Sequence, residues 1–449
     1  MFLKVFLFIL IWLLTITLTH ANDPDFKMYR WLEDYQYLKN ETEPDWYDSI
    51  KYTPIGDESY ASFGGTLRQR FNHFDNDRFG LFGAPDGYLL LHRLLLHGDF
   101  HFGENFRAFV EIGSHLVDKD DLRPGPFDKD KLDITQAFFD LKSNGWVYRV
   151  GRQEMKLGST RLVGVRNGPN VRRAFDGVRI DKQFNSTSYR VFALSQVDVD
   201  EETFSNDANT DDTLWGLYTT TQFKRTSADI YYVGSYRANA EYFSGEANEK
   251  RHSLGTRIFG KKATWDWNFE AIYQFGDFGD QEINAWTLAS RTGYTLLSSR
   301  WKPRFSLSAN IASGDDNAND DKLKTFNPLF PNLSYFEEAS VLAPQNFYNL
   351  EPEIRLILSE SLTFSADWDI FWRLEENDAV YVRGLNPLNT TVGSSGDLVA
   401  HIPSVSFDYQ VNRHVALDMS YSYYIAEEVI EDAGGDDIHF FKLEASWVF

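Results

Sequence analysis

The chain has 449 residues, of which 43% are hydrophobic, 16% aromatic and 24% charged, and its formal net charge is -22. A mean hydropathy of -0.41 excludes a bundle of membrane-spanning helices, and the hydrophobic content excludes a disordered chain. The absence of cysteine excludes disulfides, thiolate metal sites and cysteine nucleophiles. The strong negative charge argues against a nucleic-acid partner, because binding a polyanion requires a basic face.

Residues 1–21 have the pattern of a secretory signal peptide. Lys4 precedes an uncharged apolar run from Val5 to Leu18, and Ala21 ends the segment. The run is shorter than the roughly 20 apolar residues that a spanning helix needs, so secretion is favoured over an N-terminal anchor helix. Its removal takes away one lysine and leaves a mature charge of -23.

Residues 22–61 precede the first strand pattern and are rich in aromatic side chains, including Trp31, Tyr35, Tyr37 and Trp46. Two readings stay open for this segment. It is either a periplasmic segment or a plug that turns into the rest of the domain.

From residue 62 to residue 449, side chains alternate between apolar and polar, most clearly in 265–275, 362–373 and 415–423. Many such stretches run for about 10 to 14 residues, longer than the five or six usual in soluble sheets and long enough for a tilted strand to cross a bilayer. Only a closed barrel satisfies the backbone of such strands in lipid. The sequence therefore predicts an all-β transmembrane barrel of about 18 antiparallel strands. The strands are expected to start near residues 62, 88, 105, 133, 146, 173, 188, 213, 227, 251, 264, 284, 302, 347, 361, 398, 413 and 438.

The connections between these stretches alternate in length, as expected for short periplasmic turns and longer extracellular loops. Short links fall at 103–104, 143–145, 261–263, 359–361 and 410–413. Long ones fall at 75–87, 119–132, 157–172, 197–212, 238–250, 313–346, 375–397 and 425–437. The pattern places the protein in the outer membrane of a Gram-negative bacterium.

The chain ends in an alternating stretch closed by Phe449. This ending resembles the signal that outer-membrane barrels present to the assembly machinery, which we therefore expect as a partner. Four polar residues fall on the face that the alternation assigns to lipid, either as interface residues that reach water or through an error of one residue in register: Gln69, His92, Arg149 and Lys182.

Several short sequence segments resemble those of the bacterial alginate export family, and they occur in order along most of the chain. They include Tyr29–Tyr35, Phe63–Arg70, Gly151–Glu154, Arg173–Arg179 and Phe326–Pro331. The resemblance implies an 18-stranded outer-membrane barrel that conducts the anionic polymer alginate through an arginine-rich lumen. Another acidic glycan, and transport inwards, stay open as alternatives.

Arginines dominate the cations on the polar face of the predicted strands, where they would line the lumen. A guanidinium keeps its charge and holds a carboxylate with two hydrogen bonds, which suits a polymer with one carboxylate per sugar. The alternative is that neighbouring carboxylates such as Asp140, Asp266 and Asp367 neutralise them as scaffold. The predicted substrate pathway consists of Arg68, Arg70, Arg93, Arg107, Arg152, Glu154, Arg173, Arg179, Arg257, Arg304, Arg355 and Arg373.

Two loops carry further hypotheses. Loop 157–172, with Arg161, Arg166 and Arg172, either folds inwards and narrows the lumen or stays exposed. The run from Asp315 to Asp320 is most simply a solvated charge run, although Asp315, Asn317 and Asn319 offer the oxygen ligands that calcium prefers. Asp320 and Phe326 stand where the calcium loop of an EF-hand needs Gly and Glu.

No nucleophile elbow, paired-histidine helix motif or phosphate-binding glycine loop occurs in the sequence, so we expect no enzyme and no cofactor. The leading hypothesis is a passive channel for an acidic polysaccharide. The alternatives are a porin for small anions or oligouronides, and an adhesion or structural barrel.

Overall fold

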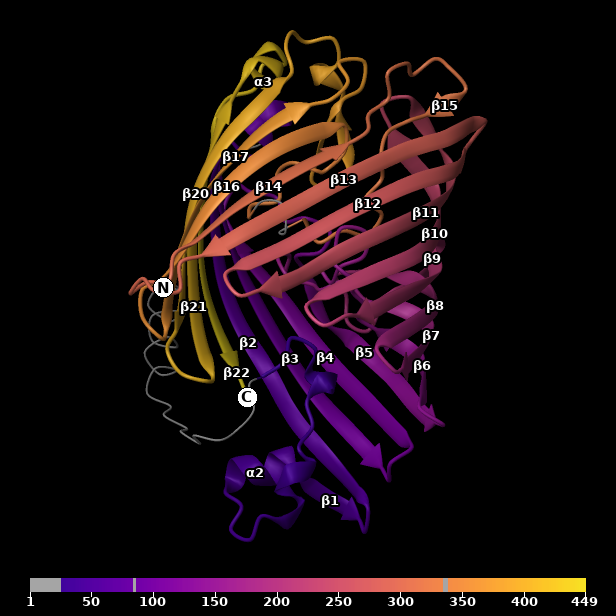
Figure 1. Ribbon diagram of the computed structural model, residues 1–449, viewed down its shortest axis with the longest axis vertical. Coiled ribbons are helices and arrows are strands. Elements are labelled where there is room, and N and C mark those ends of the chain that lie inside the picture. The colour runs from indigo at the N-terminus through magenta and orange to yellow at the C-terminus, as the bar shows by residue number, and fades with distance from the viewer. Residues whose placement is uncertain (1–25, 84–85, 334–337) are drawn as a thin grey trace.

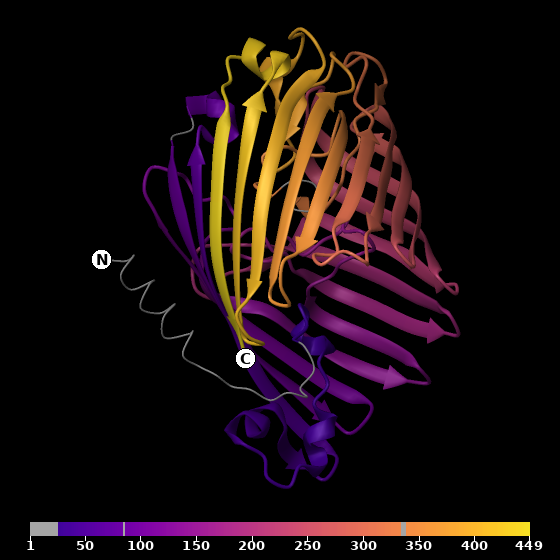
Figure 2. The same cartoon turned by 60° about the vertical axis from the view of Figure 1, so that its left-hand side comes forward.

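The computed structural model describes residues 26–83, 86–333 and 338–449. Its 18 long strands form a closed antiparallel barrel, seen from two sides in Figures 1 and 2. The barrel closes where β2 (Ser59–Asp75) pairs with both β3 (Gly87–Phe102) and β22 (Ile438–Val448). The predicted fold class is therefore confirmed. The predicted signal peptide, residues 1–21, lies outside the described residues.

The barrel wall between β3 and β22 follows chain order. Its strands are β4 (Phe106–Lys119), β5 (Asp130–Ser143), β6 (Trp146–Gln153), β7 (Phe175–Phe184), β8 (Thr187–Asp198), β9 (Asp207–Gln222), β10 (Thr226–Tyr242), β11 (Gly245–Lys262), β12 (Trp265–Phe278), β13 (Gln281–Thr295), β14 (Arg304–Ala312), β16 (Phe347–Ile357), β17 (Leu362–Arg373), β20 (Leu398–Gln410) and β21 (Val415–Ala426).

The remaining elements are short. They are the strands β1 (Thr53–Gly56), β15 (Lys322–Leu323), β18 (Val380–Val382) and β19 (Asn386–Leu388), the helices α2 (Trp46–Lys51) and α3 (Glu428–Asp432), and the 3-10 turns η1 (Arg30–Leu32), η2 (Gln36–Asn40), η3 (Asp77–Gly83) and η5 (Asn389–Thr391). None of the helices in the described part of the chain is long and apolar enough to cross a membrane.

The predicted strand starts agree with the structure to within a few residues, with two larger differences. β9 begins at Asp207 instead of near 213, and β11 begins at Gly245 instead of near 251. Residues 238–250 are therefore mostly the ends of two paired strands and not a loop, because the β10–β11 ladder continues to the pair Tyr242 and Gly245.

The two ends of the barrel differ. The helix α2 and the strand β1 lie beyond one end, close to the end of β22, and α3 lies at the other (Figure 1). The connections at the first end have at most eight residues, whereas all the long loops lie at the second end, together with the short turns 243–244 and 279–280. The first end therefore faces the periplasm and the second faces the outside of the cell.

Side chains alternate between the outer surface and the lumen along each strand. Leu94 and Leu96 are each 39% exposed on the outside of β3, whereas Arg93 and His97 on either side of them are buried inside. Gln69 and His92 lie on the lipid-facing side, as predicted, and hydrogen-bond to each other there.

The predicted register of β6 is wrong by one residue. Arg149, expected to face lipid, is buried inside the barrel, where its Nε and Nη2 donate to the two carboxylate oxygens of Asp140, both at 2.7 Å. Arg152, expected in the lumen, lies on the same face of β6 as Tyr148 and Val150, which are 37% and 53% exposed on the outside. A shift of one residue moves every side chain of a strand to the opposite face.

Candidate functional site

The loop between β6 and β7, residues 154–174, folds into the lumen. Val163 and Val165 at its centre are 0% and 2% exposed. Its backbone pairs with a second inward segment, since Phe330 donates to the carbonyl of Leu162 and Gly164 donates to that of Phe330, both at 2.8 Å. Of the two readings of loop 157–172, the inward one is correct, and we call residues 154–174 the constriction loop.

Three arginines of the barrel wall hold one side of this loop by its carbonyl groups. Arg68 donates from Nη1 to the carbonyl of Asn167 at 2.6 Å, and Arg70 donates to that of Gly168 at 3.2 Å. Arg93 donates from Nε to the carbonyl of Asn170 at 2.7 Å. These predicted pathway residues therefore position the loop.

The opposite side of the loop is held by Glu270 of β12. Its carboxylate accepts hydrogen bonds from Ser159 Oγ and, at 2.7 Å, from the hydroxyl of Tyr231, and it lies 3.5 Å from Arg161 Nε. Next to it, a Cβ atom on Gly158 would lie 2.1 Å from the hydroxyl of Tyr218. Only glycine allows this approach, so the loop is fixed to both walls.

Glu154 and Arg172 form a buried ion pair within the constriction loop. Arg172 donates from Nε and Nη2 to the two carboxylate oxygens of Glu154, at 2.6 and 2.9 Å. Arg173 next to it donates to the carbonyls of Gly164 and Pro331 at 3.3 and 3.2 Å. Burial with few compensating charges lowers the pKa of Arg173 well below its usual range.

The other predicted pathway residues have separate surroundings. Arg107 pairs with Asp99, Arg179 with Asp181, and Arg257 with Asp229. Arg304 pairs with Asp266 and Glu353, and Arg152 pairs with Asp176 on the outer face of the rim. Arg373 donates to the carbonyls of Thr391 and Gly396 in an outer loop. Arg355 is exposed on the same face of β16 as Glu353.

A cavity of about 460 Å³ lies on the outer side of the constriction loop. Five arginines and three carboxylates line it. Arg383 lies 2.5 Å from Asp77, and Arg70 lies 3.8 Å from Glu338. The remaining arginines, among the residues that the structure describes, have no carboxylate within ion-pair distance: Arg78, Arg123 and Arg166.

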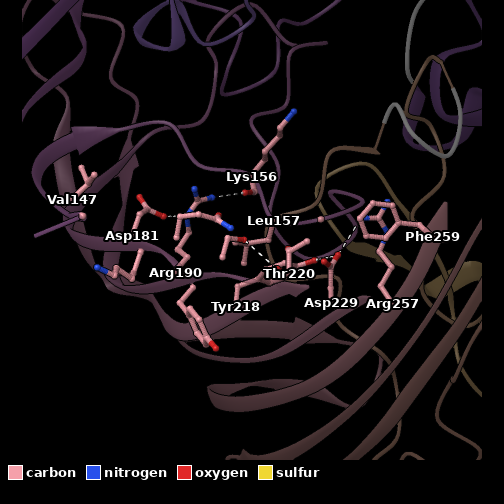
Figure 3. Close-up of a pocket in the computed structure, with 16 residues that line it drawn as sticks. Val147, Lys156, Leu157, Asp181, Arg190, Tyr218, Thr220, Asp229, Arg257 and Phe259 are labelled. Carbon is pink, nitrogen blue, oxygen red and sulfur yellow. Dashed lines mark hydrogen bonds and ion pairs between the residues drawn. The ribbon is translucent and has the colours of Figure 1, made fainter. Parts of the chain in front are cut away.

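A second cavity, of about 510 Å³, lies on the periplasmic side of the loop (Figure 3). Four basic side chains and two carboxylates line it. Arg190 and Arg257 reach it from β8 and β11 and pair with Asp181 at 2.6 Å and Asp229 at 3.1 Å, as the dashed lines of Figure 3 show. Both cavities therefore carry an excess of basic side chains, although the whole chain is acidic.

Of the residues that line these two cavities, the predicted pathway includes Arg70 and Arg257 but not Arg78, Arg123 and Arg383. The missed residues lie in long loops, where no alternation marks a lumen-facing side. The only available signal was that they are basic residues in otherwise acidic loops.

The acidic run at 315–320 makes its own internal contacts. The side-chain oxygens of Asp315 and Asn317 accept backbone N–H groups of Asn317 and Asn319, at 3.3 and 3.2 Å. Lys324 pairs with Asp316 and Asp320. Across residues 26–83, 86–333 and 338–449, no group of three or more histidine and acidic side chains is arranged to hold a metal ion.

A closed 18-stranded barrel with an inward loop between two charged cavities defines an outer-membrane channel. The profile of the alginate export family matches residues 59–443, and the chain belongs to that family. No curated protein is significantly similar in sequence.

Solved structures with the same fold include porins of Pseudomonas. OccK11 (OpdR) of Pseudomonas aeruginosa is 12% identical over 89% of this chain and 99% of its own, with a TM-score of 0.60. OccK2 (OpdF) of the same organism, solved in complex with glucuronate, is 12% identical over 87% and 98%, with a TM-score of 0.59. A BenF-like porin from Pseudomonas fluorescens Pf-5 is 12% identical over 87% and 98%, with a TM-score of 0.61.

Proposed function

We propose that this channel conducts alginate, an acidic polysaccharide built from uronates, and that arginines line its path. The observation that carries the proposal is the outer cavity, in which Arg78, Arg123 and Arg166 have no carboxylate partner among the described residues. Family membership supports the choice of polymer. The complex of OccK2 with glucuronate supports it further, because glucuronate is itself a uronate.

The chemistry of a uronate polymer fits such a path. Each sugar carries one carboxylate, which a guanidinium binds through two hydrogen bonds. An exposed ion pair contributes only about 0.2 to 1 kcal/mol. A chain held by several weak contacts enters the channel and still moves on, as conduction requires.

The net charge of -22 does not oppose this proposal. Many of the carboxylates lie in exposed loops, where salt screens their field over about 8 Å. The side chains that line the cavities set the local field that a passing anion meets.

A second candidate is the uptake of oligouronides or small anions. The observation that favours it is the constriction loop, which is fixed to both walls of the barrel and narrows the path for a long polymer. Both candidates use the same arginines and differ in the size of the solute.

We also propose that the assembly machinery recognises the end of β22. The ring of Phe449 stacks on that of Trp447, with the centroids 4.6 Å apart, so the last strand ends in an aromatic pair. Deletion of Phe449 is expected to reduce the amount of folded barrel in the outer membrane.

The test of the channel proposal is block of the ionic current by oligomannuronate added from the outer side. Replacement of Arg78, Arg123 and Arg166 by Gln is expected to raise the half-blocking concentration by about 1.4- to 5-fold for each arginine removed. Arg300→Gln, in an exposed turn at the periplasmic end, is the matched control and should leave it unchanged. Equal block in all variants contradicts the proposal.

A further inference from the structure

We propose that residues 26–51 are a displaceable plug that closes the periplasmic mouth. When docked, the plug occupies a subsite for the polymer that is formed by arginines next to aromatic rings. The part of the proposal that concerns the polymer rests on the proposed function. The part that concerns closure does not, because it is tested with small ions alone.

The plug enters the lumen through Tyr29 and Trp31, which are 6% and 9% exposed. The two rings form a buried cluster with Phe109 and Phe138 of the barrel wall and with Val165 of the constriction loop. The plug from the periplasmic side and the constriction loop from the outer side therefore meet inside the barrel. Opening of the lumen requires movement at this contact.

Trp31 contacts three arginines at this end of the lumen. The guanidinium of Arg149 lies over its indole ring at 3.9 Å, and that of Arg179 lies at 5.2 Å. Its carbonyl oxygen accepts a hydrogen bond from Arg107 Nη2 at 2.5 Å. A cation over an aromatic face is an attractive contact, so the plug takes the place of another partner of these arginines.

The same side chains have the chemistry of a subsite for a uronate. Arg149 holds Asp140 with Nε and Nη2, and its buried Nη1 has no hydrogen-bond partner among the described residues. That Nη1 is available to a carboxylate once Trp31 leaves. The ring of Phe138 meets Trp31 edge to face at 6.1 Å, and the guanidinium of Arg149 lies over its face at 3.6 Å, so Phe138 holds Arg149 in place when Trp31 leaves.

The buried contact leaves polar atoms of the plug unsatisfied. In the described part of the protein, neither the hydroxyl of Tyr29 nor Nε1 of Trp31 has a hydrogen-bond partner, and both atoms are buried. An unpaired buried donor costs free energy, whereas outside the lumen it would donate a hydrogen bond to water. Docking of the plug is therefore weaker than its apolar contacts suggest, which suits a segment that is displaced.

The plug is held outside the lumen at the seam where β2 meets β22. Arg30 donates from Nη2 to the carbonyl oxygen of Phe449 at 2.9 Å and lies near that of Gly65, at 3.4 Å. Lys51 donates from Nζ to the carbonyl of Phe63 at 2.9 Å. Opening of the periplasmic mouth therefore releases Arg30 and Lys51 from these contacts as well.

The first test is the conductance of the full-length protein in KCl across planar bilayers. The double variant Tyr29→Ala and Trp31→Ala should conduct several-fold more than the unaltered protein. Trp46→Ala is the matched control, because Trp46 belongs to the same segment but is 59% exposed outside the barrel. Folding of each variant is checked by its strand circular dichroism. A folded double variant with unchanged conductance overturns the plug.

The second test adds oligomannuronate from the periplasmic side. Trp31→Ala should lower the half-blocking concentration several-fold, and the further change Arg149→Gln should reverse this gain. Higher conductance with unchanged block overturns the subsite while the plug stands. Absence of block from either side in every variant contradicts the proposed function instead.

Discussion

Arg93 holds Asn167 at two points, since its Nη1 donates to the side-chain oxygen at 2.8 Å and its Nη2 donates to the carbonyl at 3.0 Å. The arginine comes from the barrel wall and the asparagine from the constriction loop. Arg93 therefore positions the backbone of the loop and is not free to bind a solute. The distinction between positioning arginines and available arginines determines what each substitution does.

Arg93→Met should loosen the constriction loop. The change removes donors to three residues of the loop, and hydrogen bonds to a charged group contribute about 1.5 to 3 kcal/mol each. We expect a lower unfolding temperature in detergent and a noisier, larger KCl current. Arg355→Met, in an exposed lumen residue, serves as the control. Equal effects of the two substitutions would show that Arg93 does not hold the loop.

Gly158→Ala should displace the loop from the opposite wall. Gly158 has a φ of +46°, and an added Cβ would lie 2.1 Å from the hydroxyl of Tyr218. The left-handed backbone alone costs an alanine about 1 kcal/mol, and the overlap adds to this. We expect a changed KCl conductance that Tyr218→Phe partly restores. A normal conductance in Gly158→Ala contradicts the described fit of the loop.

The closure by residues 26–51 should depend on pH. Burial lowers the pKa of Lys51 to about 7, and the charges of Arg30 and Arg413 act in the same direction, whereas Glu33 opposes them. A free lysine titrates near 10.4. Since docking favours the uncharged amine, it is strongest above that value and weakens as the pH falls towards 7.

We therefore expect the KCl conductance to fall as the pH rises from about 7 to about 10. Lys51→Met should remove this dependence, and Lys39→Met, in an exposed residue of the same segment, should preserve it. A pH profile that is the same in all three proteins would exclude Lys51 as its origin.

The sequence alone predicts the barrel because period-two alternation is strong wherever one face meets lipid. The stretch 265–275 is an example, and it lies in β12 as expected. The register of β6 was missed because its eight residues include Val147 and Gly151 on the lumen side, so its two faces differ little in polarity. The residue that fixes the orientation, Asp140, lies on the neighbouring strand.

The contacts that each arginine makes are harder to predict from the sequence than the side of the barrel wall on which it lies. Alternation places Arg68 in the lumen but does not reveal that its partner is the carbonyl of Asn167, 99 residues away in sequence. Arg123 and Arg166 lie in loops, where no periodicity indicates their direction. Contacts between loops and wall depend on how each loop folds, which a local pattern does not encode.

Whether arginines set the field in the lumen is tested by the reversal potential of the purified channel in a KCl gradient, before and after the addition of oligomannuronate. An arginine-lined path predicts anion selectivity, block by the oligomer, and loss of both in the variant that replaces Arg78, Arg123 and Arg166 by Gln. Cation selectivity without block would contradict it, because the carboxylates and not the arginines would then set the field in the lumen.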